Sequence, residues 1–492
     1  MRAKKHFVTL QQIEDSNRYY ELKLDNVHYY SWLRYYVQDV ILYGSYNLTQ
    51  ESVGSKPSSK MEIFFRLALP QLAEQTKKFI ERKNYDIYTS YTEGALREIN
   101  GRTINHLTWF LKEKLDYSVL ENMAGMRIIN KDSVRPCADT NFVIPRILMH
   151  THSFITQSQR RLLAKPKHEL QEAIKTINNG LGLNISYEEA NEQVSGSVYV
   201  FQFMLRYYRR LIRHSNFKII IASCTALTPE HSALVFAARE RGIPTIEFQH
   251  GAGGYPFDMN TIDKTATGKY YADYFFTFGD YWHSWLEPPS YVKVVSVGYP
   301  LIERFREVAK NLSSESDSVI FISSLLYGSE MSKLAMRFAD VIAPKGFKVI
   351  YKLHPAEKLS WKKLYPWLLK ACNVEVVDTD TSVYNFLVST KHVVGVISSV
   401  LYEAMAFGCN VYLWNNKNFN SELLSMSYLI DNKMVELFEC EAELLNKIMG
   451  RGNAHGDITS SDIFYKRNSI NNINTAIQNI INGSEAISNR KS

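Results

Sequence analysis

Two histidines that follow apolar runs are the residues best suited to carry chemistry in this sequence. His250 comes directly after the apolar run at residues 243–248 and stands in a glycine-rich turn. An imidazole has a pKa near neutrality, so His250 can take a proton from a hydroxyl group at physiological pH. Glycines let the backbone come close to a ligand. We therefore expect His250 to be a general base. The neighbours that we assign to the acceptor side are Gln249, Gly251, Gly253 and Gly254.

His354 is the second candidate, and polar residues at other strand ends accompany it. It follows the apolar run at residues 347–353. The carboxyl ends of parallel strands meet at one edge of an open α/β sheet, where ligands bind. We expect His354 to hydrogen-bond a phosphate oxygen or to protonate a leaving group. The other strand-end residues that we assign to nucleotide binding are Ser323, Ser324, Pro355, Ser398 and Ser399.

Ser398 and Ser399 also stand before a helix predicted at residues 401–407. Free N–H groups and the helix dipole favour a phosphate at such an N-terminus, although a serine there is also an ordinary helix cap. Glu403, one turn into the helix, could reach a ribose hydroxyl pair. A further polar segment follows the strand pattern at residues 85–90, and it predicts either a solvated connection or a loop that faces the site. From that segment we assign Glu93 and Arg97 to the acceptor side.

The elements that must position these residues form two α/β series. A strand at 217–222, a helix at 229–241 and a strand at 243–248 make a parallel βαβ unit. A second series of strands and helices begins at residue 319, after a linker with an exposed helical piece at 299–316. The fold class that we predict is α/β of the GT-B type, with two Rossmann-like doubly wound domains facing across a cleft. The expected units are residues 1–300 with helical N-terminal additions, 301–462 as the nucleotide-donor domain, and 463–492 as a helical tail.

Composition excludes several classes of protein. A chain of 492 residues with 45% hydrophobic and 22% charged residues is typical of a globular protein with more than one domain. The formal net charge of +7 is compatible with an anionic substrate or membrane face but is too diffuse to indicate nucleic acid. No run reaches the roughly 18–20 apolar residues of a membrane span. The five cysteines lack metal spacing, and no signal peptide is evident, so we expect a cytoplasmic, soluble or peripheral protein.

Other motifs are absent, and one basic cluster is present. The sequence contains no Walker P-loop, dinucleotide-binding glycine pattern or Gly-x-Ser-x-Gly elbow, so an ATPase, a dinucleotide dehydrogenase and an α/β-hydrolase are disfavoured. We expect no metal and no cofactor beyond the nucleotide-linked substrate. The basic cluster could touch anionic lipid headgroups, or it could be the solvated face of a helix. Its members are Arg206, Arg209, Arg210 and Arg213.

Over roughly residues 217–415 the chain resembles the GT-B glycosyltransferases. Tyr351-Lys352-Leu353-His354-Pro355 is similar to the His-Pro motif of bacterial sialyltransferases and related capsule enzymes, and Ser398-Ser399 with Glu403-Ala404 is similar to their Ser-Ser motif. This resemblance implies that the Ser-Ser pair holds the phosphate of a CMP-sugar. Gln249-His250-Gly251 resembles the His-Gly motif of teichoic-acid CDP-glycerol glycerophosphotransferases and, with Gly298-Tyr299-Pro300, a wider group of surface-carbohydrate proteins. Sialyltransferases carry an acidic pair before glycine at this strand end, whereas this chain has Gln249 and His250.

The sequence and the resemblance together predict a metal-independent glycosyltransferase for a bacterial capsule or lipopolysaccharide. The enzyme would move a sugar from a nucleotide-activated donor, with CMP-sugar favoured, to an oligosaccharide or lipid-linked acceptor. The cytoplasmic face of the inner membrane is a further expected partner, and nucleic acid is not. Alternatives are a CDP-alcohol phosphotransferase of the teichoic type, a sugar-nucleotide epimerase, and a non-catalytic glycan-binding module.

Overall fold

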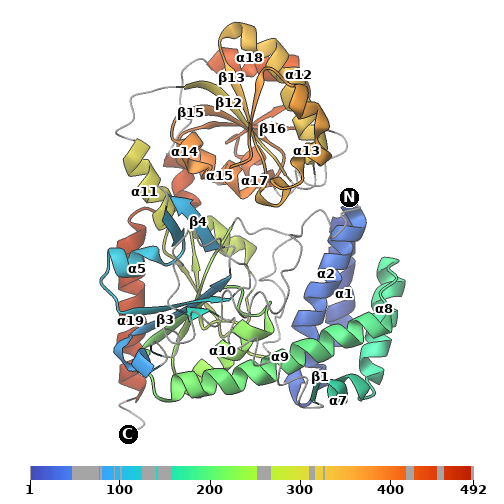
Figure 1. Ribbon diagram of the computed structural model, residues 1–492, viewed down its shortest axis with the longest axis vertical. Coiled ribbons are helices and arrows are strands. Elements are labelled where there is room, and N and C mark those ends of the chain that lie inside the picture. Colours follow the sequence, from blue (N-terminus) through green and yellow to red (C-terminus); the bar gives the residue numbers. More distant parts are fainter. Residues whose placement is uncertain are drawn as a thin grey trace.

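The structure is a computed structural model in which two parallel sheets form the centres of two domains (Figure 1). The described residues are 2–46, 77, 80–92, 95–99, 102–124, 140–141, 158–251, 267–286, 288–309, 316–324, 327–379, 381–416, 426–451 and 459–488. Among them, no helix combines the length and the apolarity that crossing a membrane requires.

The first domain is built on a seven-stranded sheet in the order β11-β10-β9-β8-β3-β6-β7, and every neighbouring pair is parallel. The chain steps outward from β3 to β6 and β7, and helices then return it to the other side of β3, at β8. The strands are β3 (Ile87–Thr92), β6 (Val119–Ala124), β7 (Thr140–Asn141), β8 (Ile219–Ala222), β9 (Thr245–Phe248), β10 (Tyr274–Thr277) and β11 (Lys293–Ser296).

Helices cover both faces of this sheet. On one face, α9 (Tyr187–Arg213) and α10 (Pro229–Glu240) cover the sheet; α1 (Arg2–Asn17), α2 (Tyr30–Tyr46), α7 (Ser158–Ala164) and α8 (His168–Leu181) pack beside it, against α9 and one another. The other face packs against α5 (Trp109–Glu113), α11 (Pro300–Ala309) and α19 (Ser469–Ser488). The start of α10 agrees with the sequence prediction, because Thr228 Oγ1 accepts a hydrogen bond from the His231 N–H and Pro229 is the first helical residue.

The second domain is built on a six-stranded sheet in the order β14-β13-β12-β15-β16-β17, again with only parallel pairs. Its strands are β12 (Ser316–Ile322), β13 (Lys348–Lys352), β14 (Val374–Val377), β15 (Thr390–Gly395), β16 (Asn410–Trp414) and β17 (Glu436–Phe438). Its helices are α12 (Gly328–Ile342), α13 (Trp361–Leu364), α14 (Tyr384–Leu387), α15 (Ser399–Ala406), α17 (Ser427–Asp431) and α18 (Glu441–Arg451).

Short elements complete the described chain. Two antiparallel pairs are β1 (Lys23–Leu24) with β2 (Val27–His28) and β4 (Leu96–Ile99) with β5 (Arg102–Asn105). The 3-10 helices are η1 (Tyr19–Glu21), η4 (Glu81–Asn84), η6 (Asp280–Trp285), η7 (Ala343–Lys345), η8 (Pro355–Glu357), η9 (Pro366–Lys370) and η12 (Thr459–Ile463).

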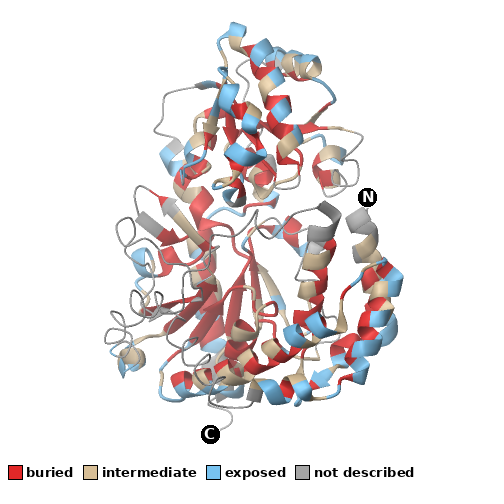
Figure 2. Ribbon diagram, turned by 45° about the vertical axis from the view of Figure 1, so that its right-hand side comes forward, coloured by how far each residue is buried: buried red, intermediate tan, exposed pale blue. Residues whose placement is uncertain are grey.

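Both sheets have the doubly wound topology, so the predicted fold class is confirmed. In each sheet the strand order reverses once, between β3 and β8 in the first domain and between β12 and β15 in the second. Such switch points are where open α/β sheets place their ligands, beyond the carboxyl ends of the strands. The central strands of both sheets are buried (Figure 2). The chain is therefore a GT-B fold of two Rossmann-like domains.

A continuous apolar core joins the two domains. It runs from the first sheet through α11 and α19 to the second sheet. The expectation of an exposed helical piece in the linker is wrong, because Leu301, Ile302 and Phe305 of α11 are buried in this core. α19 runs alongside the first domain (red in Figure 1), where Gln478 Nε2 donates a hydrogen bond to the Tyr117 hydroxyl at 2.6 Å.

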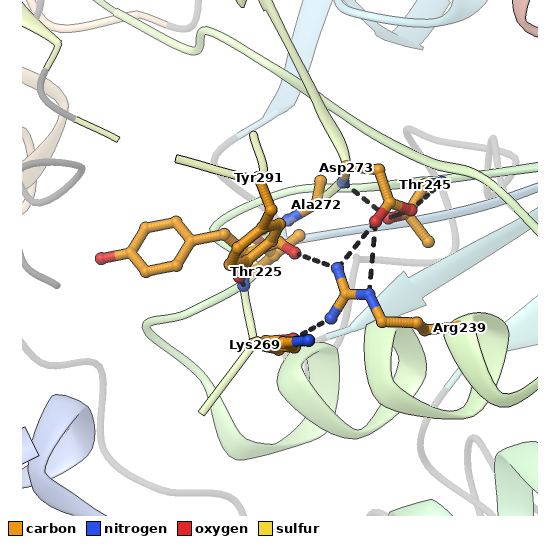
Figure 3. Close-up of polar contacts among 8 residues, drawn as sticks. Thr225, Arg239, Thr245, Lys269, Ala272, Asp273 and Tyr291 are labelled. Carbon is orange, nitrogen blue, oxygen red and sulfur yellow. Dashed lines mark hydrogen bonds and ion pairs between the residues drawn. The ribbon is translucent and has the colours of Figure 1, made fainter. Parts of the chain in front are cut away.

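A polar cluster fixes the amino ends of β9 and β10, at the opposite edge of the sheet from His250 (Figure 3). The Asp273 carboxylate accepts hydrogen bonds from the N–H and hydroxyl of Thr245, at 2.9 and 2.8 Å. Arg239, from α10, pairs with the same carboxylate at 2.8 Å and also donates to the carbonyls of Tyr271 and Lys269. These contacts hold β9 in place from its amino end.

The basic cluster of α9 is the outer face of a core helix. Tyr208, Leu211 and Ile212 on the same helix are buried against the first sheet. Arg209 forms a bidentate pair with Glu240, at 2.6 and 2.8 Å. The apolar side of this helix is therefore not available to a membrane, and the interpretation as a solvated helix face is the one that fits.

Candidate functional site

His250 lies just beyond the carboxyl end of β9. All residues of β9 are buried, so the turn begins where this buried strand ends. The His250 imidazole, in contrast, is exposed to solvent. The pKa of His250 is lowered, first by desolvation and second by the positive charge of Arg97. Because the side chain keeps access to water, screening limits both effects. Both nevertheless favour the neutral imidazole, which is the form that accepts a proton.

Gln249 locks the turn that carries His250. Its side-chain Nε2 donates to the Gly251 carbonyl at 2.8 Å, and its Oε1 accepts from the Phe278 N–H at 2.9 Å. Gln249 is buried, and both ends of its amide are engaged within the protein. We expected Gln249 on the acceptor side, and the structure places it beneath the turn as a support for His250 and Gly251. Gly253, Gly254 and Glu93, the other predicted neighbours, lie outside the described residues.

Arg97 is a charged residue that acts on groups of both domains. It lies on β4 of the β4–β5 hairpin and not on a loop, and its side chain is half-buried. Its charge lowers the pKa of His250 in the first domain and opposes the rise in the pKa of Glu403 in the second. The guanidinium of Arg97 therefore acts electrostatically on one residue in each domain. The signal for this hairpin was present in the sequence, because Asn100-Gly101 stands between its two strands.

His354 follows β13, and a buried carboxylate holds its backbone. The His354 N–H donates to Glu357 Oε2 at 2.8 Å, and the Tyr365 hydroxyl donates to Glu357 Oε1 at 2.6 Å. The His354 imidazole is exposed, as is Pro355 at the start of η8. Desolvation is the main cause that lowers the pKa of His354; Glu357 opposes the shift and Lys352 adds to it. A neutral imidazole at this position can donate an N–H to a phosphate oxygen.

The serines follow the strands on either side of the second switch point. Ser323 and Ser324 follow β12 and are buried, and Ser323 Oγ accepts a hydrogen bond from the Tyr351 hydroxyl at 3.0 Å. Ser398 caps α15 by accepting from the Val400 N–H at 3.3 Å, and both Ser398 and Ser399 are half-buried. His354, Ser323 and Ser398 thus stand at the ends of three adjacent strands, which together span roughly 10 Å.

Glu403 is enclosed at the domain junction. Its side chain is 9% exposed, and Tyr384 and Ser399 are neighbours that act on its carboxylate. Burial raises the pKa of the carboxyl group, and Tyr384, the charge of Arg97 and Ser399 oppose that rise. We expected Glu403 to reach a ribose. The carboxylate instead lies within the protein, one helical turn from the serine that it contacts.

The contacts of Glu403 continue into the first domain. Tyr384, at the start of α14, interacts with Tyr299, and the Tyr299 hydroxyl lies 2.6 Å from His106 Nδ1. All members of this line except Ser399 are buried, and desolvation is the first cause that lowers the pKa of His106. We call Ser399, Glu403, Tyr384, Tyr299 and His106 the junction line. It connects the start of α15 in the second domain to the end of the β4–β5 hairpin in the first.

Sequence reasoning missed three members of this line. His106, Tyr299 and Tyr384 come from separate parts of the chain, and 193 residues separate the first two. No local spacing marks such a contact. Tyr299 was noticed only within the Gly298-Tyr299-Pro300 motif, without a role.

Among the described residues, a small cavity lies near the switch point of the first sheet. It is lined by the ends of β3, β8 and β9 and by residues that follow β5. Beside it, Ser90 Oγ lies 3.0 Å from His231 Nε2 and accepts a hydrogen bond from Asn122 Nδ2 at 3.2 Å, and these residues are buried. In the described part of this sheet edge, His250, two strands away from β3, is an exposed titratable side chain.

Several solved structures are similar to this chain at low TM-scores. UDP-GlcNAc 2-epimerase from Methanocaldococcus jannaschii, in complex with UDP-GlcNAc and UDP, has a TM-score of 0.38 and 11% identity, over 76% of this chain and 97% of the other. UDP-N-acetylglucosamine 2-epimerase from Rickettsia bellii has a TM-score of 0.44 and 11% identity, over 80% and 98%. A UGT transferase from Siraitia grosvenorii, in complex with UDP, has a TM-score of 0.40 and 10% identity, over 80% and 100%. No protein-family model and no curated sequence matches this chain. The fold assignment therefore rests on the strand order of the two sheets.

Proposed function

We propose that this protein is a glycosyltransferase that moves a sugar from a nucleotide-activated donor to a growing surface glycan. The donor phosphate would lie beyond the second switch point, against His354, Ser398, Ser399 and the first turn of α15. The acceptor hydroxyl would approach from the first domain, at His250. In support, each group follows the carboxyl ends of the strands in its own sheet.

One observation carries the proposal. The charge of Arg97 acts on His250 and on Glu403, and Glu403 contacts Ser399 at the start of α15. One positive charge therefore acts both on the candidate base and on a residue that neighbours the candidate phosphate site. A guanidinium in this place would also favour an anionic donor.

The chemistry needs one proton transfer and one displacement. Neutral His250 would take the proton of an acceptor hydroxyl while that oxygen attacks the anomeric carbon. The bond from this carbon to the donor phosphate oxygen would break, and the nucleotide would leave with the electron pair. His354, the serines and the free N–H groups of α15 would stabilise the leaving phosphate. The proton would remain on His250 until it passes to water.

A CMP-sugar is the favoured donor class, because the His-Pro and Ser-Ser motifs resemble those of CMP-sugar enzymes. The test is to incubate the protein with CMP-, UDP-, GDP- and CDP-activated donors and glycan acceptors. Free nucleotide together with an elongated glycan would support the proposal. A product with a bridging phosphate would support a CDP-alcohol phosphotransferase instead, and an isomerised donor would support an epimerase. Absence of any nucleotide binding would contradict all three.

Two variants separate the proposed roles. His250→Ala should leave nucleotide affinity nearly unchanged and abolish turnover, whereas His354→Ala should raise the donor KM and lower kcat. His214→Ala is the matched control, because His214 is an exposed histidine at the end of α9. Isothermal titration and product release measure the two properties separately. If His250→Ala abolished nucleotide binding, the division of roles between the two domains would be wrong.

A further inference from the structure

An exposed surface of leucines and lysines follows the His354-Pro355 motif. Leu359 is 90% exposed, Leu364 37% and Leu369 58%. Among the described residues, eight large apolar side chains are this exposed, and three of them fall within these eleven positions. Single exposed leucines are ordinary, but a cluster of them indicates an interaction surface. We call residues 358–370 the leucine–lysine surface.

The buried side of the same segment holds the leucines outward. Trp361, Tyr365 and Leu368 are buried in the core of the second domain. Trp361 Nε1 donates to Asp378 Oδ2 at 3.2 Å, and the Tyr365 hydroxyl donates to Glu357. The segment is thus anchored by its aromatic residues, so its leucines cannot turn inward without breaking these contacts.

Every charged residue within the segment itself is a lysine. Residues 358–372 include no aspartate or glutamate. The nearest acid before them, Glu357, is fully buried and engaged by His354 and Tyr365. A further lysine, Lys333 on α12, stands 4.5 Å from the centre of the Trp367 ring. The lysines within the segment are Lys358, Lys362, Lys363 and Lys370.

We propose that the leucine–lysine surface binds the anionic headgroup layer of a lipid membrane. Lysines are attracted to such a surface, and leucines between them can enter the boundary with the acyl chains. Leu359 lies five residues after His354, and α13 lies at the right-hand edge of the upper domain in Figure 1. Binding would therefore bring the candidate donor site near the membrane. That this serves a lipid-linked acceptor rests on the proposed function; the membrane contact itself does not.

In this proposal the membrane contact is the leucine–lysine surface and not the arginine cluster of α9. The apolar residues of α9 are buried in the first domain, and Arg209 is paired with Glu240. The leucine–lysine surface, in contrast, exposes its apolar residues beside its charges.

Sedimentation with vesicles of phosphatidylglycerol and phosphatidylcholine tests the proposal. Lys363→Gln with Lys370→Gln should lower the partition coefficient of the full chain about thirtyfold at low salt, at about 1 kcal/mol for each lysine. The matched control is Lys345→Gln with Lys348→Gln, which removes the same charge at the opposite end of β13. Both control lysines are exposed, and this pair should change the partition coefficient little.

A second variant tests the apolar part. Leu359→Ser with Leu369→Ser should lower vesicle binding at least tenfold in low and high salt alike, because burial of apolar surface is not screened. The lysine-dependent part should fade as salt shortens the Debye length from about 10 Å at 0.1 M to about 3 Å at 1 M. All variants should keep the nucleotide affinity of the unmodified protein.

The outcomes are separable. The proposal would be overturned if the lysine variant and its control lost the same amount of vesicle binding. It would also be overturned if the protein bound anionic and neutral vesicles equally well. Loss of binding in Arg206→Gln with Arg210→Gln, but not in the lysine variant, would return the contact to α9. A protein that binds vesicles through this surface but binds no nucleotide would refute the proposed function and leave the membrane contact intact.

Discussion

Gly298 should be the glycine at which substitution harms this protein most clearly. It lies where the chain leaves the first sheet for the second domain, with a φ of +97°. A Cβ atom there would overlap the Lys466 carbonyl oxygen and would lie 2.6 Å from Ser469 Cβ and 3.0 Å from Ser469 Cα. The start of α19 therefore closes directly over this position. Gly346 is a matched control, because its φ is +87° and no heavy atom would lie within 4 Å of its Cβ.

The expected magnitudes follow from these two environments. A positive φ costs a residue with a side chain about 1–2 kcal/mol. Replacing glycine also restricts the unfolded chain, which returns about 0.4–1 kcal/mol. Gly346→Ala should therefore lower the free energy of unfolding by about 1.6 kcal/mol at most. Gly298→Ala carries the same two effects and adds overlap with backbone atoms, which costs a further 1–3 kcal/mol or so.

Urea unfolding followed by circular dichroism measures both variants. We expect Gly298→Ala to be less stable than Gly346→Ala by about 1–3 kcal/mol. Because Tyr299 comes next in the chain, we also expect weaker nucleotide binding in Gly298→Ala, through displacement of the junction line. Equal stability losses in the two variants would refute the reasoning, since they would show that the neighbours of Gly298 move aside without cost.

Three further predictions concern the site. The lowered pKa keeps the His250 imidazole neutral to lower pH, so the activity should fall only below the usual imidazole pKa. In Arg97→Ala the pKa of His250 should rise, and the loss of activity on the acid side of the pH–rate profile should move to higher pH. An acid side at the same pH in both proteins would count against the role of Arg97. Glu357→Gln should raise the donor KM severalfold with a smaller change in kcat, because the Glu357 carboxylate anchors the His354 backbone. Steady-state kinetics on each donor measure both constants, and a large fall in kcat at an unchanged KM would contradict this role. Tyr299→Phe should lower the free energy of unfolding by about 1–3 kcal/mol, because the substitution removes the hydroxyl that contacts the buried His106 Nδ1. Thermal unfolding measures this loss, and an unchanged melting temperature would contradict the contact.

Local signals predict much of this fold. The strands at β14 and β16 have the bounds expected from their apolar runs, since β-branched and aromatic residues there are bounded by polar ones. Thr228 and Pro229 mark the start of α10 because a cap and a fixed φ act within one turn. The β4–β5 hairpin was missed because its strands are short and polar, and only Asn100-Gly101 marks the turn.

The site is less predictable, because its residues depend on contacts between distant segments. Strand ends identify His250, His354 and the serines, since topology alone brings carboxyl ends to one edge. Spacing cannot tell which of these side chains remain reachable. Ser323 and Gln249 are in the expected places, yet both are hydrogen-bonded within the protein.

Glu403 shows what the junction adds to the motif. Four residues separate it from Ser399 on one helix, so the pair can be recognised from spacing, but its burial comes from the other domain. Through Tyr384 and Tyr299, the carboxylate that contacts Ser399 is linked to a histidine of the first domain. If the angle between the domains changed, the contacts along the junction line would lengthen, or its residues would have to move together. The start of α15 is therefore connected to the first domain through buried side chains.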